Sequence, residues 1–434
     1  MKNYHIVHRD KDSWAVVKEG AMRAASVHKT RKEAMAAAKA LLKTHPEYSL
    51  SVEGQESAAV REVAVAYNPS TGIDKCVSDF NRMFGERLKR ARIMRGYSLR
   101  SLSEALEGEW SHTQLQKFEK GLASVDTKAL SRLSRVLDVR PDFFVKKADL
   151  GFTEAEYRSL TKVGIKKRER LKEEAFEFFE RYLEIENVVG VRRKKLPTYD
   201  LQSKSFEEIG EAIEDAAEDL RERWQLGRNP IPNVHSMLEQ HGVMVKLFDE
   251  APKGFDGLAT VAKVGKREFP SIALARSKDL PRLRLTALHE LAHLVLNLPS
   301  DLEQKEKERL CHRFANAFLV PEKEFTLSFG GERKHVTASE LVAIKEEWGI
   351  SCKAIITRAR SLGLVSKGYA KGFYIRYNRW ERDYGEWIGS EESKRFDLLV
   401  NQALSKGLIS VSKAAGLLGA SVDSLMSGMD WQGE

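Results

Sequence analysis

The 434-residue sequence has no run of roughly 18 apolar residues, the length that a helix needs to cross a bilayer, so no membrane span is expected. Cysteine is scarce: Cys76, Cys311 and Cys352 are odd in number and far apart, which excludes a disulfide framework and a zinc site made of cysteine alone. Residues 1–14 carry charges where a secretory signal needs an apolar core. These absences predict a cytoplasmic protein.

The composition is that of a globular protein. Apolar residues make up 42% of the chain and charged residues 31%, which excludes wholesale disorder. Lys and Arg number 72 against 63 Asp and Glu, a net charge of +9, so the chain has a basic surplus. At roughly 100 to 200 residues per domain, the length predicts about two to four domains.

The pattern of apolar residues predicts a multidomain, mainly α protein with α+β parts. The predicted ranges are a ββαββ domain (1–66), an all-α domain (80–148), a helical connector (149–200), an α+β domain (201–368) and a helical extension (369–434). In the first domain, strands are expected at 4–8, 13–18, 49–52 and 60–66, with a helix over 30–42. This domain resembles a small bacterial domain of unknown function and shows no catalytic pattern.

In the α+β domain, three strands are expected over 242–250, 257–264 and 270–276, followed by helices over 281–297 and 304–319. The first of these helices contains His289-Glu290-Leu291-Ala292-His293, an H-E-x-x-H motif. His289 and His293 lie one helical turn apart, with Cβ atoms about 5 to 6 Å apart, so both can bind one Zn²⁺. Glu290 lies on the flank, where it can deprotonate a water molecule. The alternative is a chance match on a surface helix.

The second helix offers a third ligand. Its apolar stripe extends back to Glu308, and a carboxylate on a buried stripe needs a cation nearby. His312, one turn later, is the alternative ligand. Three protein ligands leave the open position that a hydrolytic zinc site requires.

The segments RLRLTALHELAHLVLN and ERLCHRFANAFLVPE resemble the ImmA/IrrE family of bacterial zinc metallopeptidases, and the similarity extends over about residues 206–364. The resemblance implies that His289, His293 and Glu308 bind zinc and that Glu290 is the general base. It also implies a repressor-type substrate, cut in a stress or DNA-damage response. One departure is His312, where the family usually has Asn.

Residues 84–145 resemble the XRE, or lambda-repressor-like, helix-turn-helix domains. Ser98 is predicted to cap a first helix and Ser111 a second one of recognition-helix length. The expected contacts with double-stranded DNA are His112, Thr113, Gln114 and Gln116 at base edges and Lys117, Arg90 and Arg100 at phosphates. The last two belong to a basic cluster with Arg82, Arg87, Lys89, Arg92 and Arg95.

Two departures from the XRE pattern keep open the alternative that this domain binds another protein. Leu99 replaces the usual Gln, and Glu107 and Glu109 place carboxylates in the turn.

The sequence therefore predicts a cytoplasmic regulator in which a zinc endopeptidase and an XRE-type domain share one chain; whether it forms a homodimer stays open. The strand over 270–276 is expected to be an edge strand that holds an extended substrate. The helical segment 152–189 is expected to hold the domains apart or to mask the site. The alternative function is a non-proteolytic transcription factor or antitoxin that uses the peptidase fold as a sensor.

Overall fold

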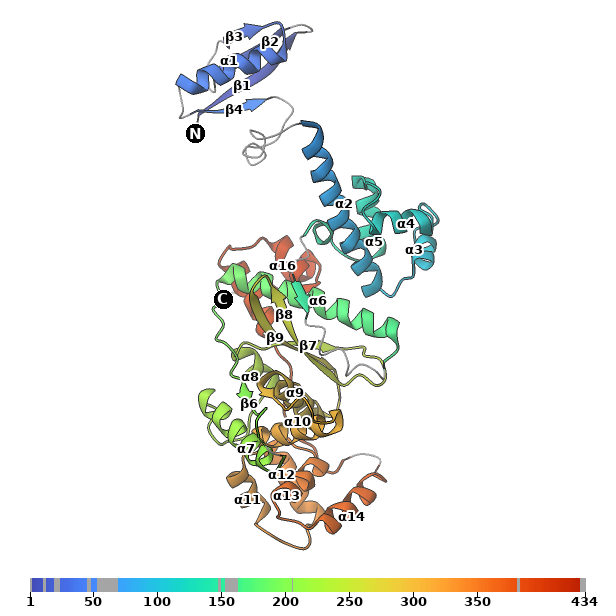
Figure 1. The fold of residues 1–434 in the computed structure, drawn as a ribbon, viewed down its shortest axis with the longest axis vertical. Helices are drawn as coiled ribbons and strands as arrows, with labels where there is room; N and C mark the ends of the chain where they lie inside the picture. Colours follow the sequence, from blue (N-terminus) through green and yellow to red (C-terminus); the bar gives the residue numbers. More distant parts are fainter. Residues whose placement is uncertain are drawn as a thin grey trace. The chain divides into compact units, whose positions relative to one another are not determined.

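The computed structural model describes residues 2–10, 13–18, 24–44, 48–52, 69–146, 150–152, 163–204, 206–380 and 383–429. It divides into two compact units, Met1–Asp79 and Phe80–Glu434 (Figure 1). Both units combine helices with small sheets, and the first consists mostly of one four-stranded sheet and a helix. Among the described residues, no helix is long and apolar enough to cross a bilayer.

The first unit begins with strands β1 (Lys2–Asp10), β2 (Ser13–Lys18) and β3 (Ala24–His28), helix α1 (Arg31–Thr44) and strand β4 (Tyr48–Val52). The sheet order is β3-β2-β1-β4, and Ala34 and Ala38 of α1 pack on Ile6 and Val16. The described elements thus run β-β-β-α-β, which corrects the predicted ββαββ order. The prediction missed β3 because its alanines have low strand propensity and the strand depends on pairing with β2. The strand predicted at 60–66 lies outside the described residues.

The next part of the chain is all helical, as predicted. It contains α2 (Pro69–Met94), α3 (Leu99–Ala105), α4 (His112–Glu119), α5 (Thr127–Val136) and the short 3₁₀ helix η3 (Pro141–Val145). Ser98 and Ser111 are the caps of α3 and α4: their hydroxyls accept the backbone N–H of Ser101 at 3.0 Å and of Gln114 at 3.2 Å. The helices enclose one core, which includes Phe84, Leu88, Leu102, Leu115 and Leu133.

The α+β region contains a four-stranded sheet in the order β5-β8-β9-β7. Its strands are β5 (Leu150–Phe152), β7 (Met244–Phe248), β8 (Gly257–Val264) and β9 (Arg267–Ala275). β8 and β9 form an antiparallel hairpin, and β7 pairs with β9 in parallel. β9 therefore lies inside the sheet, and the expectation that residues 270–276 form an edge strand was wrong. A two-residue pair, β6 (Tyr199–Asp200) with β10 (Leu296–Asn297), lies outside this sheet.

Neighbouring residues of β9 point to opposite faces of the sheet, as strand geometry requires. Ile272 and Leu274 join the core with the helices of one face, which carries the H-E-x-x-H motif. These helices are α7 (Phe206–Arg223), α8 (Val234–Gln240), α9 (Leu280–Val295), α10 (Gln304–Leu319), α11 (Glu322–Phe329), α12 (Ala338–Trp348), α13 (Cys352–Ser361) and α14 (Lys367–Tyr377).

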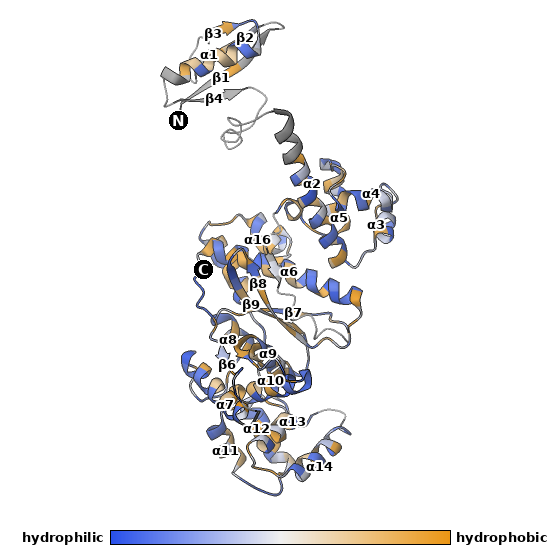
Figure 2. Ribbon diagram, in the orientation of Figure 1, coloured by the Kyte–Doolittle hydropathy of each residue, from blue (hydrophilic) through white to orange (hydrophobic). Residues whose placement is uncertain are grey.

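Phe269 and Ala273 of β9 point to the other face, where they join a second core. This face is covered by α6 (Ile165–Val189), α15 (Arg395–Ser405), α16 (Val411–Leu418) and α17 (Val422–Met429). Hydrophilic and apolar residues alternate along α6 (Figure 2). The predicted connector and C-terminal extension thus share a core with the sheet; the five predicted domain ranges stay a prediction.

A buried ion pair fixes the start of α9. Arg284 donates to Glu391 at 2.5 Å and to the carbonyl of Ile231 at 2.7 Å, and both charged side chains are fully buried. Glu391 also accepts the backbone N–H of Val234 at 2.9 Å and of His235 at 3.1 Å. The pair therefore ties α9 to the start of α8 and to the segment before α15.

Candidate metal centre and nucleic-acid interface

Helix α9 presents the H-E-x-x-H motif at the wall of a cavity. Asp279 caps the helix by accepting the backbone N–H of Arg282 at 3.1 Å, and Leu288 and Leu291 anchor it in the core. His289 and Glu290 are buried, whereas His293 is partly exposed. The cavity has a volume of about 1150 Å³ and is lined by His289, Glu290 and Glu308, among others.

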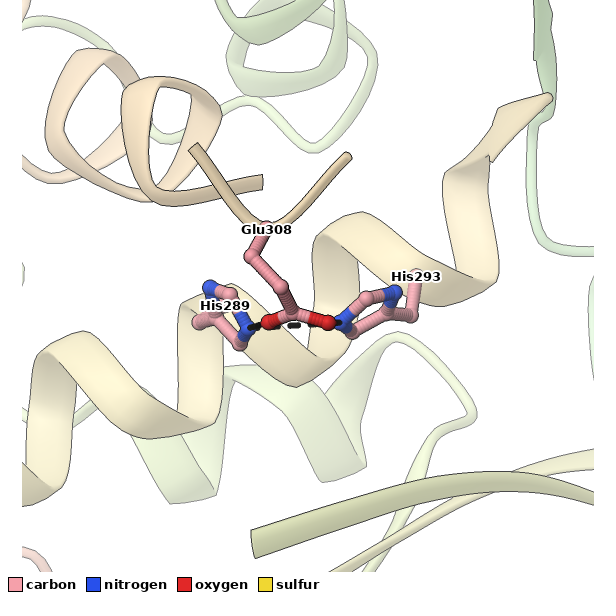
Figure 3. Close-up of side chains that lie close together, drawn as sticks. All are labelled: His289, His293 and Glu308. Atoms are coloured by element: carbon pink, nitrogen blue, oxygen red, sulfur yellow. Dashed lines mark hydrogen bonds and ion pairs between the residues drawn. The ribbon is translucent and has the colours of Figure 1, made fainter. Parts of the chain in front are cut away.

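Helix α10 packs on α9 and brings Glu308 to the two histidines (Figure 3). His289 Nε2 lies 2.9 Å from Glu308 Oε2 and 3.2 Å from His293 Nε2. Glu308 Oε1 lies 3.8 Å from His293 Nε2. The ligand atoms of these three residues all lie within 4.8 Å of one another, so they converge on one point.

This donor set fits a zinc ion. Tetrahedral coordination at Zn–N distances of about 2.0 to 2.1 Å places two ligand nitrogens about 3.3 Å apart, close to the observed 3.2 Å between the Nε2 atoms. The pKa of Glu308 is lowered to about 2, and the hydrogen bond from His289 is the largest cause. Burial, followed by the nearby His289 ring, lowers the pKa of His293 to about 4. At neutral pH both groups are therefore in the deprotonated forms that bind metals.

Two neighbours of this triad were not predicted. Gln304 donates its amide N–H to Glu308 Oε1 at 2.7 Å and so orients the carboxylate. Its spacing of four residues from Glu308 on one helix was the available signal. Cys311 Sγ lies 3.6 Å from His293 Nδ1, and burial raises the pKa of its thiol, which keeps it neutral.

His312 is outside the converging set of ligand atoms among the described residues. Its ring packs on the ring of His289 instead, with centroids 4.1 Å apart and planes tilted by 37°. His312 therefore fits the role of a residue in the wall of the site better than the alternative role of a metal ligand.

Glu290 faces the first residue of β8. A Cβ atom at Gly257 would lie 2.9 Å from Glu290 Oε1, so glycine is the residue that allows this approach. No residue of α6 lines the cavity. The expectation that the segment 152–189 masks the site therefore finds no support in its described part.

The predicted base-reading side chains lie on α4. His112, Thr113, Gln116 and Lys117 are exposed, and Gln114 is partly exposed. Arg100, in the first turn of α3, is exposed too.

The departures from the XRE pattern have structural explanations. Leu99 packs against the helical core. Arg132 on α5 lies 2.6 Å from the Glu107 carboxylate and 3.8 Å from that of Glu109, so it offsets the charge in the turn.

Arg90 differs from its predicted role at phosphate. Its guanidinium donates to Glu173 of α6 at 2.8 Å and stacks on Phe176 at 3.3 Å from the ring centroid. Other arginines of the basic cluster are engaged as well: Arg87 with Glu180, Arg92 with Glu119 and Arg95 with Asp138. Arg82, Lys89 and Arg100 of this cluster are exposed.

Three family models match the chain. Residues 238–360 match the peptidase family model described as "IrrE N-terminal-like domain", and residues 88–144 match "Helix-turn-helix". Residues 4–63 match "Uncharacterized protein conserved in bacteria (DUF2188)".

A curated relative is the "SPbeta prophage-derived uncharacterized HTH-type transcriptional regulator YonR" of Bacillus subtilis (strain 168). It is 41% identical over 64 residues, which are 15% of this chain and 57% of that protein. The chain contains an IrrE-like peptidase-family domain and an XRE-type helix-turn-helix domain.

Proposed function

We propose that the chain is a zinc-dependent endopeptidase that regulates transcription and cuts a repressor-type protein in a stress or DNA-damage response. The observation that carries the proposal is the convergence of His289, His293 and Glu308 on one point, beside the buried Glu290, at the wall of one cavity. A zinc ion held there supplies Lewis-acid polarisation of a peptide carbonyl and acidifies water. Glu290 accepts the proton of the attacking water and passes it to the leaving amine.

The substrate pairs with the edge of β8, and not with the strand over 270–276 that the sequence suggested. Among the described residues, β5 pairs only with the end of β8, Ala262–Val264, and leaves Gly257–Val261 unpaired on that side. α9 packs against β8, and a Cβ atom at Gly257 would lie 2.9 Å from Glu290 Oε1, so this edge passes close to Glu290. An extended peptide can add to this edge by main-chain hydrogen bonds.

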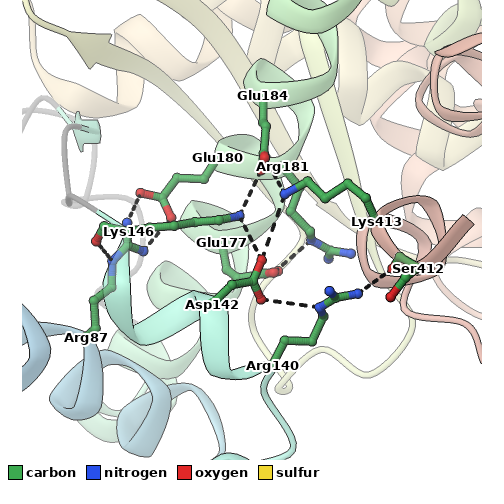
Figure 4. A network of polar contacts seen from close by, with 10 residues as sticks. All are labelled: Arg87, Arg140, Asp142, Lys146, Glu177, Glu180, Arg181, Glu184, Ser412 and Lys413. Carbon is green, nitrogen blue, oxygen red and sulfur yellow. Dashed lines mark hydrogen bonds and ion pairs between the residues drawn. The ribbon is translucent and has the colours of Figure 1, made fainter. Parts of the chain in front are cut away.

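The helix-turn-helix domain is held by α6, which supports cleavage of another protein over self-cleavage. Arg87, 1% exposed, donates two hydrogen bonds to Glu180 at 2.6 and 2.9 Å (Figure 4). Lys146 binds Glu184 at 2.8 Å, and Lys413 of α16 pairs with the same carboxylate. α6 packs on the sheet face opposite to α9, and no described residue of the helix-turn-helix domain lines the cavity.

Metal removal tests the enzymatic part. Zinc-loaded protein is expected to cut an XRE-type repressor in trans, to lose this activity when a chelator removes the metal, and to regain it when zinc is added back. Gel analysis followed by mass spectrometry measures the products. Cleavage that continues after chelation would contradict a metal-dependent mechanism. If the zinc-loaded protein cuts no repressor, the non-proteolytic regulator, which the relative's name as a transcriptional regulator favours, replaces the peptidase.

Because Lys117 is proposed to contact a DNA phosphate, Lys117→Ala is expected to weaken binding to duplexes of any sequence. Loss of one phosphate contact reduces the slope of log K against log salt by about 0.9. Arg90→Ala is the matched control, because its side chain is engaged by α6 and its loss should leave the slope unchanged. Titrations of the full chain at several salt concentrations measure both. An unchanged slope in Lys117→Ala, or an equal loss in Arg90→Ala, would contradict the assignment.

A further inference from the structure

Basic residues outnumber acidic ones in the lining of the cavity around the metal triad. Its basic residues are Arg282, Arg309, Arg313, Lys353, Arg358, Arg360 and Lys367, and its acidic residues are Asp256, Asp279, Glu290, Glu306 and Glu308. The charges are unevenly distributed, because most of the basic residues come from α10 and α13.

The acidic residues outside the metal site already have partners. Asp256 pairs with Arg282 at 2.8 Å, and Asp279 caps α9. Glu306 accepts the backbone N–H of Glu303 at 3.3 Å in the capping box of α10. The residues that α13 contributes to the cavity lining, by contrast, include basic side chains and no acidic one.

Two of the arginines that line the cavity, one on α10 and one on α13, share a single carboxylate as their partner. Glu214 accepts a hydrogen bond from Arg313 at 3.1 Å and from Arg358 at 2.7 Å. In the part of the chain that the structure describes, no acidic side chain forms an ion pair with Lys353, Arg360 or Lys367. All three are exposed in the cavity wall.

Arg358 gives an independent sign of a missing partner. The residue is 1% exposed, yet within the described structure its Nε and Nη2 atoms have no hydrogen-bond acceptor. Buried N–H donors without a partner are destabilising, so an acceptor that reaches Arg358 would stabilise it.

The start of α13 adds to the positive electrostatic potential in the cavity. Ser351 caps this helix and lines the cavity, so the positive end of the helix dipole faces the space. Lys353, Thr357 and Arg360 follow at spacings of four and three residues and also line the cavity, which places them on one helix face.

We propose that the wall formed by α10 and α13, which we name the basic wall (Arg309, Arg313, Lys353, Arg358, Arg360 and Lys367), binds acidic side chains of the substrate. The preferred substrate segment then carries Asp or Glu close to the scissile bond. This inference rests on the proposed peptidase function of the cavity. A polypeptide fits better than a nucleic acid, because the same cavity holds Glu290 beside the unpaired edge of β8 and the base-reading surface lies on α4.

Peptide binding tests the basic wall without any cleavage. Two fluorescent synthetic peptides are identical except that one has Glu where the other has Gln, and they are titrated by anisotropy into zinc-supplemented full-length Glu290→Gln protein. The Glu peptide is expected to bind roughly tenfold more tightly, since two or three exposed ion pairs together supply about that factor. Adding Lys353→Glu or Arg360→Glu should remove most of this preference. Lys371→Glu, an exposed residue of α14 outside the cavity, is the control with the same charge change.

The possible outcomes distinguish failure of the basic wall as a substrate-binding site from failure of the proposed peptidase function. Equal binding of both peptides, or a preference that survives in Lys353→Glu, would overturn the basic wall. Tighter, Lys353-dependent binding of a single-stranded oligonucleotide would overturn it in favour of a nucleic-acid ligand. If the preference holds but the wild-type protein cuts neither peptide, the subsite stands and the peptidase function fails. If wild type cuts both peptides at the same rate, the function stands and the subsite fails.

Discussion

Glu290→Gln is expected to stop peptide-bond cleavage while the chain keeps its zinc and its fold. Glutamine has the same size and can hydrogen-bond a water molecule, but it cannot accept the proton. Loss of a general base lowers the rate by about 10² to 10⁴-fold. The measurement is the rate of repressor cleavage by wild type and variant at equal zinc content.

The packing around Glu290 makes this substitution a clean test. Its carboxylate lies against Gly257, and an amide of the same shape fills the same space. Glu306→Gln is the matched control, because Glu306 also lines the cavity but serves as a helix cap. An undiminished rate in Glu290→Gln would remove this residue from the mechanism, and an equal loss in Glu306→Gln would show that the effect is a general one of charge.

Glu308→Gln is expected to lose most of the bound zinc. The substitution exchanges an anionic oxygen, held in its ionised form by the neighbouring histidine, for a neutral amide at a site with three protein ligands. The affinity should fall by more than about 100-fold, because removal of outer-shell partners alone costs about 10 to 100-fold. Competition with a chromophoric chelator measures the affinity.

Gln304→Ala provides the graded comparison, since it removes the hydrogen bond at 2.7 Å and leaves the ligand in place. The zinc affinity of Gln304→Ala should fall by about 10 to 100-fold, which is less than the fall in Glu308→Gln. Equal zinc affinity in Glu308→Gln and wild type would contradict the assignment of Glu308, and His312→Ala would then be the next variant to measure.

Local sequence patterns predicted the parts of the structure that depend on local geometry. Helical spacing brought His289 and His293 to one face, and the apolar stripe of the second helix led to Glu308. The caps Ser98 and Ser111 were predictable because a cap acts within three residues.

The predictions that failed depend on contacts between distant residues. β9 lies inside its sheet because β7 pairs with its free side, and no local pattern shows that pairing. Long-range pairing also decides where the Arg90 side chain lies, because it pairs with Glu173, 83 residues away. A charged residue on a helix gives no sign in the sequence of whether its partner is DNA or another helix of the same chain.

The proposed function depends above all on a zinc site formed by His289, His293 and Glu308. Counting zinc per chain by mass spectrometry of the purified protein tests it most directly, with circular dichroism as the check on folding. We expect one zinc ion per wild-type chain and almost none in a folded His289→Ala, His293→Ala double variant. A folded wild-type chain that takes up no zinc, or a double variant that keeps its full zinc content, would contradict it.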